Sequence, residues 1–270
     1  EEAMLPNVRS GILRAQECTT YALSGKATAN GKVLAGQNAD MNHVVEDVAM
    51  VLNIIPEEGP QILMYTFSGL IGYHGMNYLG VSQFASSLPA STQGFDLHPK
   101  GKLGPGYMAK RLMLEKSTIE EILNIYDTIG IYGTGNYALT DRKGRIADLE
   151  LYPEGYDVLE DSGLGYIIHT NHYLSNKLEY LNKYGAEQRS IDSIQRLRRF
   201  DELLKKERGN ITVDKLKEFL SDHANYPYTI CRHGEMKTVA SIISEPESHC
   251  MHVSAGNPCE GRYYTYEMEY

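Results

Sequence analysis

The feature that most limits the fold is a long stretch without a charged side chain, residues 59–95. Its length would suit a membrane span, but glycine, serine, asparagine, glutamine and histidine interrupt it throughout. A surface that faces hydrocarbon does not tolerate so many polar and flexible residues. We therefore expect strands that are buried on both faces and joined by glycine turns, and no membrane partner.

Further β-type runs flank this stretch on both sides. Residues 19–24 and 32–37 are separated by Asn30-Gly31, which is the strongest local hairpin signal. The other predicted strands cover residues 48–55, 62–67, 71–76, 81–84, 137–140, 145–151, 239–244, 251–255 and 263–270.

Helical patterns occupy the middle of the chain. We expect a helix over residues 106–115, and a second one after a capping box formed by Ser117 and Glu120. A third, charged helix over residues 190–206 should bury one stripe, and Thr212 should cap a fourth. The predicted stripe consists of Ile191, Ile194, Leu197, Phe200, Leu203 and Leu204.

Strands at both ends of the chain with helices between them favour an α+β domain of antiparallel sheets with helices packed outside. No linker, repeat or low-complexity tract divides the chain. Because 35 acidic residues outnumber 26 basic ones, giving a net charge of -9, a nucleic-acid partner is largely excluded. Four cysteines are too few for a disulfide scaffold at this length, and we expect a cytoplasmic location.

Three motifs receive an ordinary structural interpretation. Gly133-Thr-Gly135-Asn-Tyr-Ala138 resembles a dinucleotide fingerprint, but it opens a predicted hairpin and not a helix. The charged residues of the third helix, Arg196 included, are typical of a solvated helix face. Soft metal ligands are plentiful, but none shows the paired spacing of a zinc finger or ribbon, so we predict no metal. Those ligands are His169, His172, Cys231, His233, His249, Cys250, His252 and Cys259.

Cys18 stands out because of its surroundings. It opens a β-run, and the hairpin that follows should bring Gln37, Asn38 and Asp40 back beside it. Amides and a carboxylate near a thiol suit a nucleophile, although a cysteine at the start of a strand is also compatible with a purely structural role.

Motifs in a fixed order along the chain add a resemblance. They are Cys18-Thr-Thr, residues 27–40 ending in Gln37-Asn38-Ala39-Asp40, residues 72–81, His169-Thr-Asn171-His172, Ser193-Ile-Gln-Arg196, Asp222-His223, residues 226–233, residues 238–243 and Gly256-Asn-Pro258. Together they resemble the acyl-coenzyme A:6-aminopenicillanic acid acyltransferase-like family of N-terminal-nucleophile (Ntn) hydrolases. The resemblance runs from about Asn7 to the C-terminus. It implies a four-layer αββα sandwich and a cysteine amidohydrolase or acyltransferase.

The resemblance also implies that a precursor cuts itself at Glu17-Cys18. Residues 1–17 would then be the C-terminal remnant of an α-chain, and residues 18–270 a β-chain forming one Ntn-hydrolase domain. The freed α-amino group of Cys18, with an ordinary pKa near 7.7–8.0, would serve as the base.

By the same resemblance Asp40 orients the new terminus, with Gln37 as a neighbouring polar position. Asn171 supplies the side-chain donor of the oxyanion hole, Ala85 supplies its backbone donor, and Arg232 supports the site.

The implied substrate is a small amide or an acyl thioester, and no cofactor is expected. The other partner is the chain's own cleaved α-chain, held as a heterodimer, and a homo-oligomer is allowed. Glu235 and Lys237 lie where penicillin-acting members carry an arginine, and Phe84 stands where asparagine is common. The alternatives are a bile-salt or penicillin V amidase-like hydrolase and a non-catalytic αββα binding protein.

Overall fold

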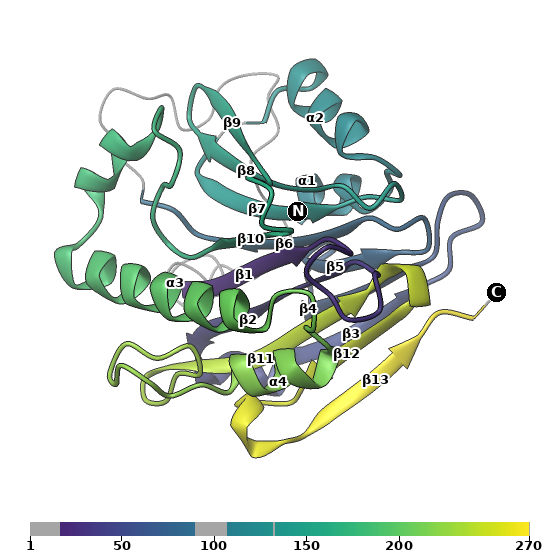
Figure 1. Cartoon of the computed structure of the whole chain (residues 1–270). Coiled ribbons are helices and arrows are strands. Elements are labelled where there is room, and N and C mark those ends of the chain that lie inside the picture. Colours follow the sequence, from purple (N-terminus) through teal and green to yellow (C-terminus); the bar gives the residue numbers. More distant parts are fainter. Residues whose placement is uncertain (1–16, 90–106, 132, 270) are drawn as a thin grey trace.

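The computed structural model describes residues 17–89, 107–131 and 133–269. Residues 1–16 of the predicted remnant, which covers residues 1–17, lie outside the described residues, as does the end of the charge-free stretch. In the described part of the chain the strands form two antiparallel sheets that pack face to face, with helices on both outer sides (Figure 1).

The seven-stranded sheet is a simple meander, in which each strand pairs with the next one in sequence. It consists of β3 (Ala49–Ile54), β4 (Ile62–Phe67), β5 (His74–Asn77), β6 (Ser82–Ser86), β7 (Gly135–Thr140), β8 (Ile146–Tyr152) and β9 (Gly155–Glu160). Every residue of β4, β5 and β6 is buried. The prediction that the charge-free stretch forms strands buried on both faces is therefore confirmed.

The six-stranded sheet joins segments that are far apart in the sequence. Its order is β10 (Tyr166–His169), β1 (Glu17–Leu23), β2 (Leu34–Asn42), β11 (Met236–Glu245), β12 (Cys250–Ser254) and β13 (Tyr263–Glu267). The predicted hairpin places Cys18 opposite Ala39 and Thr20 opposite Gln37. Close contact between β2 and β11 requires a glycine, because a Cβ on Gly36 would lie 1.9 Å from the carbonyl oxygen of Ile242.

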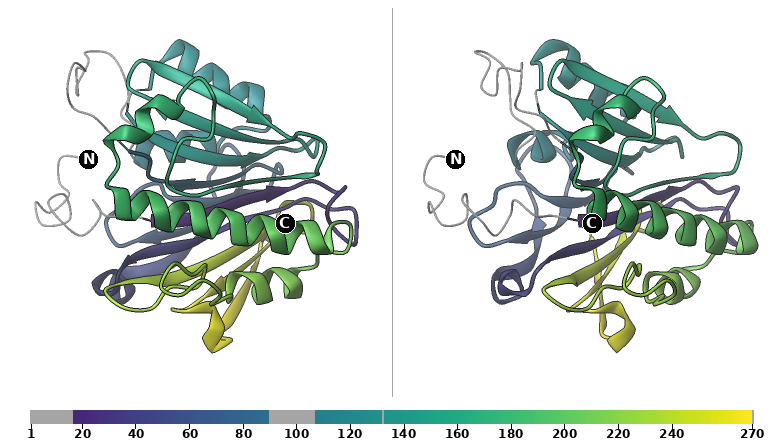
Figure 2. Two further views of the ribbon diagram at one scale, coloured as in Figure 1. Left: turned by 60° about the vertical axis from the view of Figure 1, so that its left-hand side comes forward. Right: turned by 90° about the vertical axis from the view of Figure 1, so that its left-hand side faces the viewer.

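The helices cover the two outer faces (Figure 2). Helices α1 (Tyr107–Met113) and α2 (Ile119–Thr128) lie on the seven-stranded sheet, and α3 (Glu187–Glu207) and α4 (Val213–Leu220) on the six-stranded sheet. Short 3-10 helices are η2 (His43–Val48), η3 (Glu179–Tyr184), η4 (Pro246–Ser248) and η5 (Pro258–Glu260). Within the described residues no helix is both long and apolar enough to cross a membrane.

Three apolar layers hold the four structural layers together. Met41, Met64, Phe84 and Ile242 pack between the sheets. Met113, Ile122, Tyr137 and Leu149 join the first helix pair to its sheet, and Tyr21, Leu34, Phe200 and Leu216 join the second pair. This is the predicted αββα sandwich.

Local details differ from the sequence expectations. The capping box of α2 is Thr118 with Glu121, one residue later than expected, because Ser117 donates its hydroxyl to the Glu121 carboxylate and stays outside the helix. Strands β9 and β10 had no sequence signal. The four residues of β10 are too few to show a period, and β9 is only half-buried.

Candidate active site

Cys18 lies near the start of β1, an interior strand, and is fully buried. Its side chain is on the same face of the sheet as those of Thr20 and Gln37, since directly opposed residues of an antiparallel pair share a face. This face packs against the seven-stranded sheet. Burial first, and the charge of Asp40 second, raise the pKa of the Cys18 thiol to about 12. The thiol of the continuous chain is therefore protonated at neutral pH.

Asn171 reaches Cys18 because of strand register. Thr20 pairs with His169, the last residue of β10, so the same antiparallel register places residue 171 opposite Cys18. The chain has left the strand there, and the Asn171 side chain takes the place of a backbone acceptor. Its Oδ1 accepts the Cys18 N–H at 3.1 Å, while its Nδ2 donates to the Ser87 carbonyl at 2.9 Å.

Arg196 corrects the sequence interpretation of α3. The sequence predicts a solvated basic face, but the Arg196 side chain is fully buried. Its guanidinium donates to the carbonyl of Cys18 at 2.7 Å, to Asn171 Oδ1 at 2.8 Å and to Thr19 Oγ1 at 3.0 Å. It also donates to Asp192 Oδ2 from Nε and Nη2, at 3.0 and 2.8 Å. One charged group thus connects the backbone of Cys18 with the side chain of Asn171.

The buried face of α3 is rotated relative to the predicted stripe, because Arg196 and its neighbours face the sheet. Asp192, Ser193 and Arg196 face the sheet, whereas Ile191 is 39% exposed. Ser193 Oγ accepts the backbone N–H of Asn171 at 2.7 Å, so the helix fixes Asn171 by its main chain as well.

Asp40 is fully buried on β2. Its Oδ1 accepts a hydrogen bond from Thr238 Oγ1 at 2.7 Å, and Oδ2 has no hydrogen-bond partner among the described residues. Burial raises the pKa of the Asp40 carboxyl to about 7, although the positive charges of Arg232 and Arg196 oppose the shift. A carboxyl group with this pKa can exchange a proton near neutral pH.

Arg232 lies in the loop before β11 and holds the residue that precedes Cys18. Its guanidinium bonds the Glu17 carboxylate and, at 3.0 Å, Asp192 Oδ2. Arg189 adds a second ion pair to Glu17, at 3.5 Å. The Glu17 side chain and the Cys18 carbonyl, on either side of the Glu17–Cys18 bond, are therefore both held by cations from other elements.

Gln37 and Ala85 connect the two sheets beside Cys18. The backbone N–H of Ala85 on β6 donates to Gln37 Oε1 at 3.2 Å, and Gln37 is fully buried. The Ala85 N–H, which the sequence predicts as a donor of the oxyanion hole, therefore already donates to the Gln37 side chain.

Lys110 on α1 was not singled out by the sequence. It is buried, with its Nζ 4.3 Å from the centre of the Tyr73 ring. Burial lowers the pKa of Lys110 to about 8, a shift that only the thiolate form of Cys18 would oppose. A single lysine within a predicted helix gives no sequence signal that its side chain is buried near Cys18.

The soft ligands separate into distinct places. His169 bonds Glu150 at 2.7 Å, while His249 follows η4 as its C-cap residue. By contrast, Cys231, His233 and Cys259 come together, and His223 joins them. Sequence spacing missed this group because its members come from separate segments.

Comparisons with known proteins identify a family that this chain resembles in sequence. The model of the family acyl-coenzyme A:6-aminopenicillanic acid acyl-transferase matches residues 27–260, a range that begins after Cys18. The acyl-coenzyme A:6-aminopenicillanic-acid-acyltransferase 40 kDa form of Emericella nidulans is 28% identical over 240 residues. The match includes 86% of this chain, which spans only 62% of that protein.

Two solved structures share the fold. An N-acylethanolamine-hydrolyzing acid amidase ortholog of Caenorhabditis elegans has a TM-score of 0.62 at 13% identity, with 93% of this chain and 100% of that chain covered. A mutant of the conjugated bile acid hydrolase of Clostridium perfringens has a TM-score of 0.60 at 15% identity, covering 93% and 92%. The αββα architecture and the match to the family model, which extends over most of the chain, show that this protein belongs to the acyl-coenzyme A:6-aminopenicillanic acid acyltransferase family.

Proposed function

We propose that this chain is a self-processing Ntn cysteine amidohydrolase or acyltransferase, which cleaves or transfers the acyl group of a small amide or thioester through Cys18. The observation that carries the proposal is that Cys18 is held at both of its backbone groups. Asn171 accepts its N–H and Arg196 donates to its carbonyl. These two hydrogen bonds fix the backbone of Cys18, the residue that follows the proposed scissile bond.

In the processing step the Cys18 sulfur adds to the carbonyl carbon of Glu17. The carbon–nitrogen bond then breaks, the thiol proton ends on the Cys18 nitrogen, and a thioester joins the two residues. Water hydrolyses the thioester, which releases the Glu17 carboxylate and restores the thiol. Asp40 supports this step, because its unpartnered Oδ2 is an available acceptor for the new amino group.

In the turnover step the new α-amino group accepts the thiol proton as the sulfur attacks the substrate carbonyl. The Nδ2 of Asn171 has two N–H groups and donates to the Ser87 carbonyl at 2.9 Å and, over a longer 3.5 Å, to Ser87 Oγ. The N–H that now faces Ser87 Oγ would turn to the developing oxyanion and donate to it. Ala85 would be the second donor once Gln37 Oε1 turns away from its N–H. Water or an amine then accepts the acyl group from Cys18.

The test of processing is intact-mass spectrometry on purified full-length protein. We expect two fragments that meet between Glu17 and Cys18 in the wild type, and one uncut chain in Cys18→Ala. Cys250→Ala is the matched control, because Cys250 is a buried cysteine outside the site, and it should be cut like the wild type.

An uncut wild-type chain that does not react with thiol reagents would instead favour a non-catalytic αββα binding protein. For cleaved protein, three acyl donors that the relatives suggest are tested. Release of free amine is measured with a conjugated bile acid and with an N-acylethanolamine, and release of the coenzyme A thiol is measured with an acyl-coenzyme A and 6-aminopenicillanic acid as acceptor. Preference for the bile acid conjugate would favour the bile-salt amidase alternative.

A further inference from the structure

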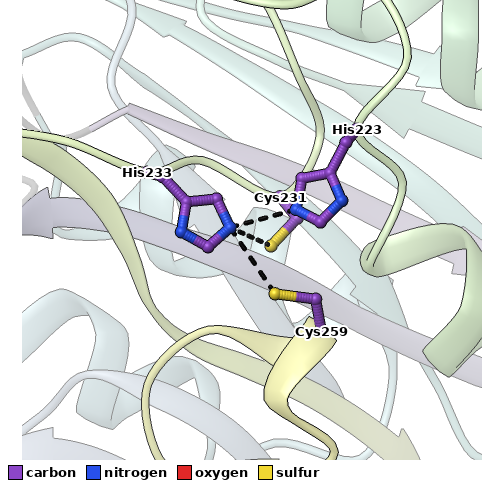
Figure 3. Close-up of side chains that lie close together, drawn as sticks. All are labelled: His223, Cys231, His233 and Cys259. Atoms are coloured by element: carbon purple, nitrogen blue, oxygen red, sulfur yellow. Dashed lines mark hydrogen bonds between the residues drawn. The ribbon is translucent and has the colours of Figure 1, made fainter.

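Two cysteines and two histidines converge at the surface beside β11, outside the candidate active site (Figure 3). We call His223, Cys231, His233 and Cys259 the Cys2His2 cluster. His223, Cys231 and His233 lie in the loop between α4 and β11, and Cys259 lies in η5. All four ligand atoms are within 4.8 Å of one another. Four thiol and imidazole groups facing one point are the usual ligand set of a structural zinc ion.

The distances within the cluster fit one tetrahedral ion. Zinc bonds of about 2.3 Å to sulfur and 2.0–2.1 Å to nitrogen imply separations of about 3.6 Å between sulfur and nitrogen, and about 3.3 Å between two nitrogens. His233 Nε2 lies 3.7 Å from Cys231 Sγ and 3.5 Å from Cys259 Sγ. The Nε2 atoms of His223 and His233 are 3.0 Å apart. Side-chain shifts of a few tenths of an ångström would complete the geometry.

The surroundings of the cluster also suit a bound metal. Asn257 Nδ2 lies 3.5 Å from Cys231 Sγ and donates to the Arg232 carbonyl at 2.6 Å. An N–H donor next to a coordinating sulfur is typical of the groups that orient metal ligands. Cys231 is buried whereas the other three ligands are exposed, so an ion can reach the site from solvent.

We propose that the Cys2His2 cluster binds one structural zinc ion, which clips the loop before β11 to η5. Binding exchanges the two thiol protons for the ion: Zn²⁺ and two S–H groups give two Zn–S bonds and two released protons. Four protein ligands fill the tetrahedron and leave no open position for a substrate, so the ion is structural. Arg232 lies between two of the ligands, and the ion therefore also fixes the loop that carries this active-site cation. The proposal does not depend on processing at Cys18.

The experiment measures zinc in protein purified without a polyhistidine tag and under reducing conditions, from cells grown with added zinc. We expect one zinc per chain in the wild type and in the uncleaved Cys18→Ala variant. Cobalt added to the stripped protein should give the visible bands of tetrahedral Co²⁺ and a sulfur-to-cobalt charge-transfer band. Cys259→Ser and His223→Ala alter exposed side chains, so these variants should still fold, yet each should lose most of the zinc.

Cys250→Ser is the matched control. Cys250 belongs to a group of only three candidate ligands, with Glu245 and His252, and its substitution should leave the zinc content unchanged. Protein without zinc that also gives no cobalt spectrum would overturn the proposal. A disulfide between Cys231 and Cys259 in metal-free protein would do so as well, and so would zinc that stays bound in Cys259→Ser.

Discussion

Replacement of Arg196 by methionine tests whether a single buried cation organises the candidate site. Its guanidinium makes five hydrogen bonds to four residues and has no exposed surface. Methionine has a similar length and no charge. Arg196→Met in a Cys18→Ala background keeps every molecule uncleaved, so the change in stability is measured on one species.

The expected loss follows from the partners that remain. Removing one member of a buried ion pair costs about 3–5 kcal/mol, because the other charge stays buried. Asp192 would keep Arg232 at 3.0 Å, which places the loss at the lower end of that range. The carbonyl of Cys18 would lose its Arg196 partner, which adds about 1 kcal/mol or more. We therefore expect Arg196→Met to lower the free energy of unfolding by about 4 kcal/mol.

Urea unfolding followed by circular dichroism measures this loss. Arg198→Met on the exposed side of α3 is the matched control and should change stability by less than about 0.5 kcal/mol. Adding Asp192→Asn to Arg196→Met should restore part of the loss, since the buried carboxylate charge is then removed while Arg232 keeps its ion pair with Glu17. If Arg196→Met loses no more than Arg198→Met, the assignment of Arg196 as an organising cation is refuted.

Three further substitutions have effects on stability that follow from the surroundings of one residue each. Asp40→Asn in the Cys18→Ala background should remove a pH dependence: burial raises the Asp40 pKa to about 7, so the folded state holds its proton more tightly and loses stability as pH rises from the ordinary carboxyl range toward 7. The free energy of unfolding of Asp40→Asn, minus that of the parent, should therefore become more positive over that pH range and level off above it. A difference that does not change with pH in urea titrations would contradict this. Gly36→Ala should destabilise by about 3 kcal/mol or prevent folding, because its Cβ would meet the Ile242 carbonyl, and a melting temperature like that of the parent would be the contrary result. Thr212→Ala should cost about 1 kcal/mol through loss of the cap on the Lys215 N–H, whereas Thr212→Ser should keep most of the stability.

The layers of the fold could be predicted because they depend on local patterns. The charge-free stretch, the Asn-Gly hairpin and the strands of the C-terminal part each carry a signal within a few residues, and the structure has strands at all of them. Strand β10 could not be predicted in this way. Its four residues are strand only because β1 provides a partner.

The candidate site was predictable only in part, for a related reason. The hairpin register, which the sequence shows, places Gln37 on the same face of the sheet as Cys18. It places Asp40 opposite Glu17, with its side chain on the other face. Arg196 and Lys110 could not be identified by pattern, because a buried cation contradicts the rule that charged residues mark a solvated face. Their burial is compensated by tertiary partners, such as the Cys18 carbonyl and the Tyr73 ring, which local sequence does not reveal.

The side-chain hydrogen bond between Asn171 and Cys18 has a consequence for how the site can move. A backbone carbonyl at this position of the ladder could change partner only if the strand itself shifted. The Asn171 amide can turn about its two side-chain torsions while Ser193 keeps hold of its main chain. Acceptance of the Cys18 N–H can therefore give way to donation toward a nearby oxygen, with β1 and β10 staying in register. The strands of the sheet stay fixed, and rotation of the Asn171 amide alone changes the group presented at this position from an acceptor to a donor.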